Sequence, residues 1–439
     1  MGSISEQGHG DGHVVLFPYM SKGHTISLLH LARRLWVTVF TTPVNRSFID
    51  QFLTETSATV ISLPFPQNIP EIPAGIESTD KLPFIDLFHS FALATIHMQS
   101  DFERALTNLS RITFMISDGF LWWTLDSAAK FSYKKDFNDD FKDADHNRQA
   151  SQASEFHVMA VVAAARSYGI IVNSFYELEP VLTDNWNTES GPKVRHIFQN
   201  IYLLAHPSLV MASSVKPTWF DWMDKKQEEG SRVLYVAFGS QAELSAEQIQ
   251  EIALGLENSM VKFLWVIRSK EYSSEAASWD IEGFQERVTE REMVVKERVD
   301  QKRVLLHECV QGFVSHCGWN SVMESICAGV PILAWSMMAD QQLNAKFVVE
   351  EGKGGLRLET CDGSTKGFVK SEGLEKMIKE LMEGEKGKEA RREAKELADL
   401  ARKAVSEGGS SCATLQLLID ETTFEKNTRV LDDKSGGLK

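Results

Sequence analysis

The polar residues best suited to chemistry follow an apolar run, residues 312–315, in the segment GFVSHCGWNSVMES. The run predicts a buried strand, and the next residues predict a tight loop and a helix whose start carries His316, Asn320, Ser321 and Glu324. The first turn of a helix presents unpaired backbone N–H groups and the positive end of the helix dipole, which bind phosphate. Glu324, one turn further on, suits paired hydroxyls. The segment therefore predicts a site for a ligand with phosphate at one end and a sugar at the other.

Each of these residues has a plainer explanation when it is taken alone. A lone His316 is most often a loop histidine with satisfied hydrogen bonds, and Asn320 with Ser321 is a helix cap. The whole set, however, has the spacing of a longer pattern that begins at Arg298, and this pattern resembles the donor-sugar box of the plant UDP-dependent glycosyltransferases of family 1, of the small-molecule O-glucosyltransferase type. The similarity runs from about residue 13 to about residue 419. The matching positions are Gln301, His316, Gly318, Trp319, Asn320, Ser321, Glu324, Pro331, Trp335, Asp340 and Gln341.

The resemblance implies a UDP-sugar donor and assigns the donor-binding residues. By that likeness, His316, Asn320 and Ser321 bind the diphosphate, and Glu324 holds the ribose hydroxyls. Trp319, Asp340 and Gln341 contact the sugar, and a Gln in the last position resembles the glucose-using members. Neither a cofactor nor a metal is implied, so UDP-glucose enters as a donor co-substrate. The other predicted donor-binding residues are Ser240, Arg298, Val299 and Gln301.

Two residues of the N-terminal half suit the removal of a proton from an acceptor hydroxyl. His24 follows an apolar strand predicted over residues 13–20, and a histidine titrates near neutral pH. Asp118 ends another predicted strand, 111–118, and a carboxylate partner fixes the tautomer of a histidine and stabilises the imidazolium. In the family that the chain resembles, the matching histidine is the catalytic base and the matching aspartate is its partner.

Aromatic residues next to Asp118 are candidates for an acceptor pocket. Phe120, Trp122 and Trp123 follow it directly, whereas the helical spacing of Phe84, Phe88 and Phe91 favours core packing. Residues 143–145 (DAD) formally match a metal-binding motif, but they lie in a polar tract with no strand before it, which favours a solvated loop. His30, His89, His97 and His157 have no ligand-like spacing.

Composition excludes several other classes of protein. The formal net charge of −15 argues against a nucleic-acid partner, since nucleic-acid binding depends on Lys and Arg. No apolar run approaches the roughly 20 residues of a membrane helix, and the first residues lack a basic and apolar leader. The five cysteines form no CxxC pair, which argues against a disulfide framework. A cytoplasmic monomer is therefore expected.

Strand and helix patterns alternate along the whole chain of 439 residues, which predicts an α/β protein with parallel sheets. The resemblance implies a GT-B fold, with two facing Rossmann-like, doubly wound domains and the active site in the cleft between them. We expect an acceptor-binding domain over 1–205, a linker over 206–218, a UDP-sugar-binding domain over 219–410, and a C-terminal helix and tail over 411–439.

The chain departs from the family pattern at several places. Arg298 stands where the family has a tryptophan that stacks on uracil. Residues 35–37 run from a predicted helix into a strand without a turn residue, and residues 132–155 are too polar for the strand and helices of the family, so segments of the acceptor domain near 36 and 131–155 are expected to be missing. Ser27 and Ser336 replace prolines.

Three hypotheses follow. The first is an inverting glycosyltransferase (hexosyltransferase) of plant secondary metabolism that moves a hexose, glucose in the first place, from a UDP-sugar to a hydroxyl of a phenolic or flavonoid acceptor. The second is a non-enzymatic remnant that keeps only the nucleotide-sugar site. The third, a Rossmann oxidoreductase, is weak because no GxGxxG loop follows the first strand.

Overall fold

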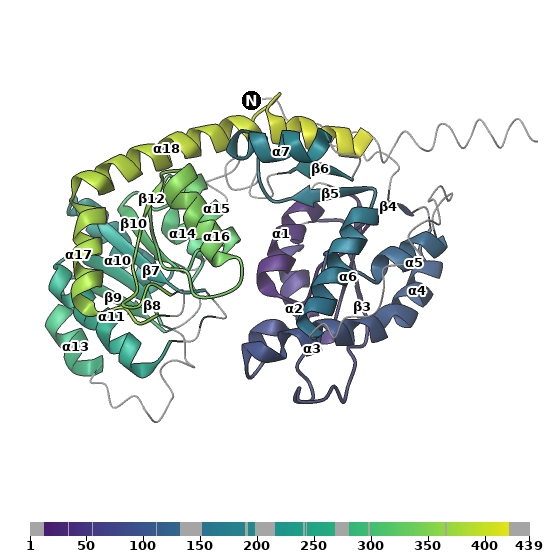
Figure 1. The fold of residues 1–439 in the computed structure, drawn as a ribbon, viewed down its shortest axis with the longest axis horizontal. Helices are drawn as coiled ribbons and strands as arrows, with labels where there is room; N and C mark the ends of the chain where they lie inside the picture. The colour runs from purple at the N-terminus through teal and green to yellow at the C-terminus, as the bar shows by residue number, and fades with distance from the viewer. Residues whose placement is uncertain are drawn as a thin grey trace, which may run out of the picture. The chain divides into compact units, whose positions relative to one another are not determined.

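The computed structural model of the chain describes residues 13–33, 35–54, 56–110, 112–131, 152–188, 192–197, 216–239, 242, 244–267, 281–296, 299–364 and 367–420. The chain forms two compact units (Figure 1). Unit 1 comprises Met1–Gln199 and Ser410–Lys439, and unit 2 comprises Asn200–Gly409. The segment expected as a separate C-terminal helix and tail therefore groups with unit 1. Most of the expected linker lies outside the described residues, and α10 (Thr218–Glu228) begins at its last position.

Unit 1 contains a parallel sheet of four strands in the order β3-β2-β1-β4. These strands are β1 (His13–Phe17), β2 (Val37–Thr41), β3 (Thr59–Ser62) and β4 (Ile112–Ser117). The helical elements along this part of the chain are α1 (Lys22–Ala32), α2 (Pro43–Phe52), η1 (Thr79–Lys81), η2 (Ile85–Leu87), α3 (Phe88–Ala94), η3 (Thr95–Met98), α4 (Gln99–Thr107) and α5 (Thr124–Phe131). Because the chain crosses from β3 on one side of β1 to β4 on the other, the strand order reverses between β1 and β4. Ligands of such sheets bind where the order reverses, at the carboxyl ends of the strands.

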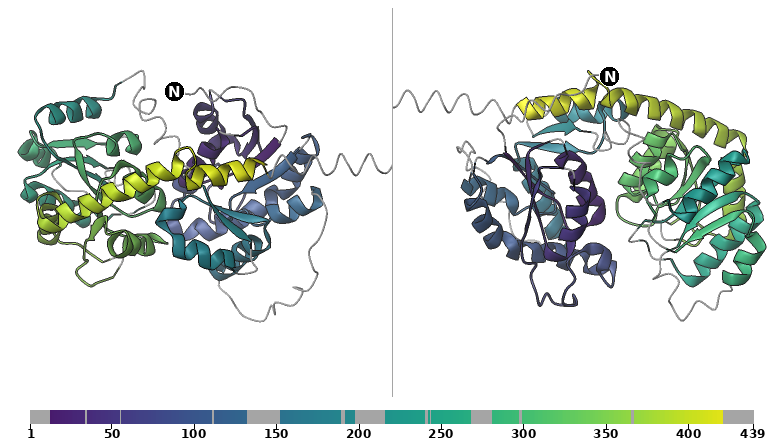
Figure 2. Two further views of the ribbon diagram at one scale, coloured as in Figure 1. Left: turned by 90° about the horizontal axis from the view of Figure 1, so that it is seen from above. Right: turned by 180° about the vertical axis from the view of Figure 1, so that it is seen from behind.

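The alternation of side chains along β1 divides unit 1 into two cores. Val14 and Leu16 pack on one face of the sheet with residues of α1 and α2, whereas Val15 and Phe17 pack on the other face with residues of α3 and α4. All four side chains are almost fully buried. Figure 2 shows unit 1 from two further directions, with helices on both sides of its sheet. Residues 410–420 are helical, and Leu415 and Leu418 join the first of these cores.

A second, two-stranded parallel ribbon completes the described part of unit 1. It consists of β5 (Gly169–Val172) and β6 (Lys193–His196), which lie after α6 (Gln152–Arg166) and on either side of η4 (Tyr176–Leu178) and α7 (Pro180–Thr188). An edge-on contact between Tyr168 and Phe114 of β4, with ring centroids 5.9 Å apart, places the start of β5 near β4. Among the described residues, however, no strand pairs with the outer edge of β4. Val158, Val161 and Val162 of α6 are exposed, so one face of that helix remains apolar and uncovered by described residues.

Unit 2 contains a parallel sheet of six strands in the order β12-β11-β10-β7-β8-β9. This is the doubly wound arrangement, in which the strand order reverses between β7 and β10. The strands are β7 (Val233–Ala237), β8 (Lys262–Val266), β9 (Glu292–Val295), β10 (Val310–Ser315), β11 (Ile332–Ala334) and β12 (Gly355–Arg357). The other elements are α10, α11 (Ala246–Ser259), α13 (Ile281–Val288), α14 (Gln301–Leu305), α15 (Trp319–Ala328), α16 (Gln341–Lys346), the π-helical turn η5 (Phe347–Glu351), α17 (Ser371–Met382) and α18 (Glu385–Val405).

Helices cover both faces of this sheet. Residues of α11, α13 and α17 form one apolar core with the strands, in which Leu256, Phe284 and Ile378 are fully buried. Figure 1 shows α14, α15 and α16 on the other side of the sheet from α11 and α13. The two charged stretches near the end of unit 2 form the helices α17 and α18.

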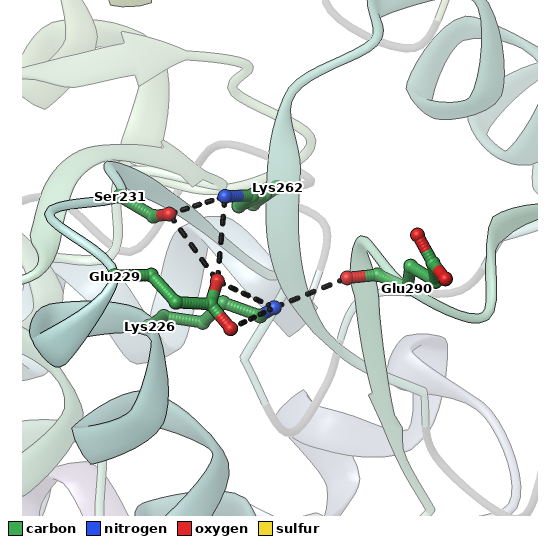
Figure 3. Close-up of polar contacts among 5 residues, drawn as sticks. All are labelled: Lys226, Glu229, Ser231, Lys262 and Glu290. Atoms are coloured by element: carbon green, nitrogen blue, oxygen red, sulfur yellow. Dashed lines mark hydrogen bonds and ion pairs between the residues drawn. The ribbon is translucent and has the colours of Figure 1, made fainter.

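A buried lysine joins α10 to the turn that precedes β9 (Figure 3). The Lys226 Nζ atom is 3.0 Å from Glu229 Oε2 and donates to the Glu290 carbonyl at 3.2 Å. Lys262 also contacts Glu229, at 3.5 Å, and donates to the Ser231 hydroxyl. Only 6% of Lys226 is exposed, and a buried ammonium group requires such partners. These partners compensate for the burial of Lys226, so the network has a structural role.

Two local features differ from their sequence expectation for identifiable reasons. The strand predicted over 13–20 ends at Phe17 because Pro18 has no backbone N–H to donate to a neighbouring strand. The helix before the second strand ends at Ala32 rather than continuing to Leu35, so residues 33–36 form a connection of ordinary length.

Candidate active site

The carboxyl ends of β1 and β4 bring together the two residues predicted to act on a proton. Phe17 and Ser117 are paired at the ends of these neighbouring strands, and His24 follows in the first turn of α1 while Asp118 follows β4 directly. The His24 Nδ1 atom lies 2.7 Å from Asp118 Oδ2. A proton on Nδ1 that is donated to this carboxylate leaves Nε2 as the basic nitrogen of the ring. The prediction that these two residues meet is confirmed.

The environment of Asp118 favours its charged form. Burial by itself raises the pKa of this carboxyl, but the charge of His24, its hydrogen bond and the backbone N–H of Phe120 together hold the pKa below its ordinary value. The Phe120 N–H donates to Asp118 Oδ1 at 2.9 Å, so both carboxylate oxygens have a donor. An ionised Asp118 at neutral pH stabilises an imidazolium on His24.

Contacts with a neighbouring segment brace the start of α1, the helix that carries His24. Lys22 Nζ lies 2.9 Å from Asp80 Oδ2, and the Ser78 hydroxyl donates to the other oxygen of Asp80. The Thr79 N–H donates to the Met20 carbonyl at 2.9 Å. The loop between β1 and α1 is thus fixed on both sides of Ser21. Sequence analysis missed this brace, because nothing near Asp80 marks it as a partner of Lys22.

Ser27, which stands where the family has proline, makes a bond that a proline lacks. Its hydroxyl donates to the Gly23 carbonyl at 3.2 Å, one turn back along α1. The hydroxyl therefore competes with the backbone for that carbonyl, which slightly destabilises a helix, whereas a proline in the first turn would preorganise it.

Aromatic rings surround the His24–Asp118 pair. Phe120 is one of them, as predicted, whereas Trp123 is not. The Phe120 ring lies 5.2 Å from the His24 ring, and Tyr19 lies 5.7 Å from His24 on an edge-on contact. Phe88 also contacts Phe120, at 5.6 Å. The prediction that Trp123 lines a pocket is wrong, since its side chain is 1% exposed and its indole N–H donates to the Thr95 hydroxyl at 3.1 Å.

The other aromatic residues considered for this pocket lie in three places: near Phe120, in the core and at the surface. Trp122 reaches Phe156 edge-on at 5.7 Å, and Phe156 in turn contacts Phe120 at 5.2 Å. Phe91 is fully buried in the core of unit 1, whereas Phe84 is exposed. The aromatic surroundings of His24 are therefore drawn from α3, α6 and the turn after β4, as well as from the loop after β1.

In unit 2, the loop between β10 and α15 holds His316 against two glycines. A Cβ atom built on Gly239 or on Gly318 would lie 2.6 Å from His316 Nε2, so both positions require glycine for the imidazole to sit where it does. Gly239 follows β7, the strand next to β10, and has a φ of +74°, which also favours glycine. His316 therefore lies at the point where the strand order reverses, with the N-terminus of α15 directly after it.

A hydrogen-bonded group links α14 to α15 beside this loop. The Gln301 side-chain NH2 group donates to Ser321 Oγ at 2.9 Å and to Glu324 Oε2 at 2.7 Å. Its carbonyl oxygen accepts from the Tyr235 hydroxyl at 3.4 Å. Val299 lies half-buried two residues before Gln301. Three predicted donor-site residues, Gln301, Ser321 and Glu324, are thus in direct contact.

The last predicted donor-site residues lie where β11 leads into α16. Gln341 accepts hydrogen bonds at Oε1 from the backbone N–H groups of Met337 and Met338, each at 3.0 Å, and no described residue accepts from its NH2 group. Asp340 is exposed next to it. Trp319 is half-buried against Phe347, with ring centroids 5.9 Å apart.

Three further predictions have separate outcomes. Trp335 is 3% exposed and packs edge-on against Phe238, so it is a core residue. Ser240 and Arg298, both predicted to bind the donor, lie outside the described residues. Ser336, at the other proline position, is buried.

No cluster of three or more His, Cys, Asp or Glu side chains suited to a metal ion occurs among the described residues. His89 of α3 and His157 of α6 do meet, with rings 5.6 Å apart, although their sequence spacing gives no sign of it. Burial and the charge of His157 lower the pKa of His89. Residues 143–145 lie outside the described residues. All five cysteines are described, and none is paired.

Sequence and structure comparisons agree on the class of protein that this architecture defines. The sequence model described as "UDP-glucoronosyl and UDP-glucosyl transferase" matches residues 195–397. UDP-glycosyltransferase 90A1 of Arabidopsis thaliana is 46% identical, over 95% of this chain and 97% of its own. UDP-glycosyltransferase 73C9 of Barbarea vulgaris is 31% identical, over 93% of this chain and 96% of its own.

Solved structures of plant enzymes have the same fold. The crystal structure of Glycyrrhiza uralensis UGT73P12 complexed with glycyrrhetinic acid 3-O-monoglucuronide has a TM-score of 0.81 at 27% identity, covering 97% of this chain and 98% of that one. Phytolacca americana UGT2, complexed with UDP-2fluoro-glucose and pterostilbene, has a TM-score of 0.72 at 26% identity and covers 93% and 99% of the two chains.

The two parallel α/β units and these likenesses define a glycosyltransferase of the GT-B fold. The chain belongs to the plant UDP-glycosyltransferases, and it is an enzyme that transfers a glycosyl group from a UDP-sugar to a small-molecule acceptor. The remnant hypothesis is not favoured by these findings, and the oxidoreductase hypothesis is wrong. None of the described helices is both long and apolar enough to span a membrane.

The chain is nevertheless shorter than UDP-glycosyltransferase 90A1 of Arabidopsis thaliana. The alignment to the 90A1 enzyme runs over 476 positions, whereas 95% of this chain is about 417 residues, so about 59 positions of the relative have no counterpart here.

Proposed function

We propose that this enzyme transfers glucose from UDP-glucose, with inversion at the anomeric carbon, to a phenolic hydroxyl, and that His24 is the catalytic base. The observation that carries the proposal is the 2.7 Å contact between His24 Nδ1 and Asp118 at the carboxyl ends of β1 and β4. That contact supports Nε2 as the nitrogen that acts on the acceptor hydroxyl. Phe120 and Tyr19 beside the imidazole offer the aromatic surface that a phenolic ring would contact.

The reaction proceeds by displacement at the anomeric carbon. His24 Nε2 takes the proton of the acceptor hydroxyl while its oxygen attacks that carbon from the face opposite the diphosphate. The bond from the anomeric carbon to the β-phosphate oxygen breaks, and its electron pair leaves with UDP. Asp118 keeps its charge throughout and stabilises the imidazolium that forms on His24.

The geometry of unit 2 supports the proposed donor roles. His316, Asn320 and Ser321 lie at the N-terminus of α15, where backbone N–H groups and the helix dipole stabilise the negative charge that develops on the diphosphate. Gln301 and Glu324, already in contact, suit the two ribose hydroxyls. The remaining proposed donor contacts are Ser240, Arg298, Val299, Trp319, Asp340 and Gln341.

Unit 1 supplies the acceptor site and unit 2 the donor site in this proposal. The reaction uses no metal or further cofactor, and the enzyme acts as a monomer in the cytoplasm. Charge supports the absence of a nucleic-acid partner, since the formal net charge is −15. The relatives support a phenolic or flavonoid acceptor, because one of them is named a UDP-glucose flavonoid 3-O-glucosyltransferase, from Fragaria ananassa, at 29% identity.

Release of UDP from UDP-glucose in the presence of quercetin or pterostilbene tests the proposal, with the product identified by mass. The full chain is compared with His24→Ala and with His97→Ala, a surface histidine control on η3. We expect turnover from the chain and from His97→Ala but not from His24→Ala. Equal rates for the chain and His24→Ala would overturn the assignment of the base. UDP binding without turnover of any acceptor would instead favour the nucleotide-sugar-binding remnant.

A chimera tests whether the shorter unit 1 limits this activity. Residues 132–151 are replaced by the corresponding segment of the 90A1 enzyme, and the rates with the same acceptors are compared. A chimera that is much faster, at unchanged UDP affinity, would show that the donor half is complete and that acceptor binding is the limiting part.

A further inference from the structure

One buried amide connects two separate parts of the donor site. Asn344 lies in α16, is 9% exposed, and donates two hydrogen bonds from its side-chain nitrogen. One goes to the Cys317 carbonyl at 3.0 Å, across 27 residues of sequence, and the other to Asp340 Oδ2 at 2.9 Å. Both N–H groups of the amide are therefore used, each on a segment that the proposed function places against the donor.

The first of these segments is under local backbone strain. Cys317 has a φ of +63°, a left-handed conformation that a residue with a Cβ rarely adopts, and it stands between His316 and Gly318. Such a conformation persists only where the surroundings hold it. The Cys317 N–H donates to Ser315 Oγ at 3.1 Å, and Asn344 holds its carbonyl. Loss of the amide removes the restraint on the carbonyl side of this turn.

The second segment carries the Asp340 carboxylate, and a hydrogen bond to one of its oxygens restricts its orientation. Asp340 is exposed and immediately precedes α16, and the side-chain nitrogen of Asn344 donates to its Oδ2. No described residue donates to the other carboxylate oxygen. A sugar hydroxyl that donates to this oxygen meets a preorganised acceptor, and preorganisation lowers the entropy lost on binding.

We propose that Asn344, anchored on the strained turn beside His316, is a positioning residue of the donor site that orients Asp340 toward the hexose. The inference rests on the proposed donor roles of those two residues. The chemistry restricts the choice of side chain. Aspartate has no N–H to donate and would repel Asp340, leucine donates nothing, and serine has one donor instead of two.

A purely structural role for the amide makes a different prediction. Loss of its hydrogen bonds would then destabilise unit 2 and weaken every ligand of that unit by the same factor. A role in orienting Asp340 weakens only the ligand that carries a hexose. UDP and UDP-glucose differ by that hexose, so the ratio of their dissociation constants separates the two roles.

Calorimetric titration of the full chain with UDP and, separately, with UDP-glucose measures this ratio for Asn344→Asp. Gln342→Glu is the matched control, because it makes the same amide-to-carboxylate change at an exposed position of the same helix. We expect the Kd for UDP-glucose to rise about ten- to a hundred-fold more than the Kd for UDP in Asn344→Asp, the range for loss of a hydrogen bond to a charged group. Gln342→Glu should leave the ratio within about twofold.

Asn344→Ser provides a second variant that keeps one donor, and we expect a smaller change of the same kind from it. An equal rise for both ligands, or no rise for either, would overturn the inference. A native chain that binds neither ligand would overturn the donor assignment of the proposed function and this inference with it. A native chain that binds both, with a ratio unmoved by either Asn344 variant, would overturn the inference alone.

Discussion

Gly239 lies directly behind the imidazole of His316, so closely that a Cβ atom at position 239 would stand 2.6 Å from Nε2. The contact joins the ends of β7 and β10, where the strand order of unit 2 reverses. A side chain at position 239 would displace the ring, because the imidazole is the movable partner. The place of His316, the histidine proposed to bind the donor, therefore depends on the absence of one methyl group.

Gly239→Ala should weaken UDP binding by about ten- to a hundred-fold, since it moves a donor of a charge-assisted hydrogen bond out of place. Titration with UDP measures the loss. Gly230→Ala is the control for backbone strain, because Gly230 has a φ of +65° and no atom within 4 Å of a built Cβ. It should lower the stability of the fold and leave UDP affinity unchanged. Unchanged affinity in Gly239→Ala would show that His316 does not bind the donor.

Asp118→Asn should reduce kcat by about a hundred- to ten-thousand-fold while UDP affinity stays the same. An asparagine presents no charge to the imidazolium and can impose the wrong tautomer on His24. Steady-state rates with UDP-glucose and quercetin, together with UDP titration, separate the two effects. The result would contradict the proposal if kcat stayed within a few-fold of the native value.

Asp118 should also contribute to the dependence of stability on pH. Its pKa in the folded protein lies below the ordinary value of 3.8, because the effects of His24 and the Phe120 N–H exceed that of burial. The stabilisation is therefore present above about pH 3.8 and is lost as the pH falls through the folded-state pKa. The difference in free energy of unfolding between the native chain and Asp118→Asn, from urea titrations, should shrink as the pH falls through this range. A constant difference would contradict this account.

The sequence predicts the site better where neighbouring strands place residues than where distant side chains meet. His24 and Asp118 each follow a strand, and parallel neighbours bring such residues together. The contacts of Lys22 with Asp80, and of Asn344 with Cys317, depend on how segments far apart in the chain fold over one another, and no local pattern encodes them. Trp123 and Phe120 show the same limit at short range, because one turn of backbone directs the first into the core and the second toward His24.

The N-terminus of α11 forms only one of the two hydrogen bonds that its sequence pattern predicts. Ser245 and Gln248 have the spacing of a capping box, and Ser245 Oγ does accept from the Gln248 N–H, at 3.2 Å. The Gln248 side chain does not return to Ser245. It bonds instead to both backbone groups of Val369, each at 2.9 Å. The contact with Val369 thus replaces the second hydrogen bond of the capping box.

Tyr19→Phe should leave the free energy of unfolding unchanged or raise it by up to about 1 kcal/mol, because the Tyr19 hydroxyl is buried without a partner among the described residues. Burial, then the charge of Asp118, raises the pKa of this hydroxyl, so it stays neutral. Tyr235→Phe is the control, since its hydroxyl bonds to Gln301. Urea titrations should show a loss for Tyr235→Phe only. A loss of more than about 1 kcal/mol in Tyr19→Phe would reveal a partner for the hydroxyl.

Arg298→Trp should tighten UDP binding. The family has a tryptophan here that stacks on uracil, and stacking of a base on an aromatic ring contributes about 1–3 kcal/mol, which corresponds to roughly five- to 150-fold in affinity. The guanidinium of arginine is planar and stacks as well, so the gain should fall toward the lower end of that range. Calorimetric titration with UDP of the native chain, Arg298→Trp and Arg298→Ala should place the affinities in the order Trp, Arg, Ala. Equal affinity for all three would show that the side chain at this position does not contact the base.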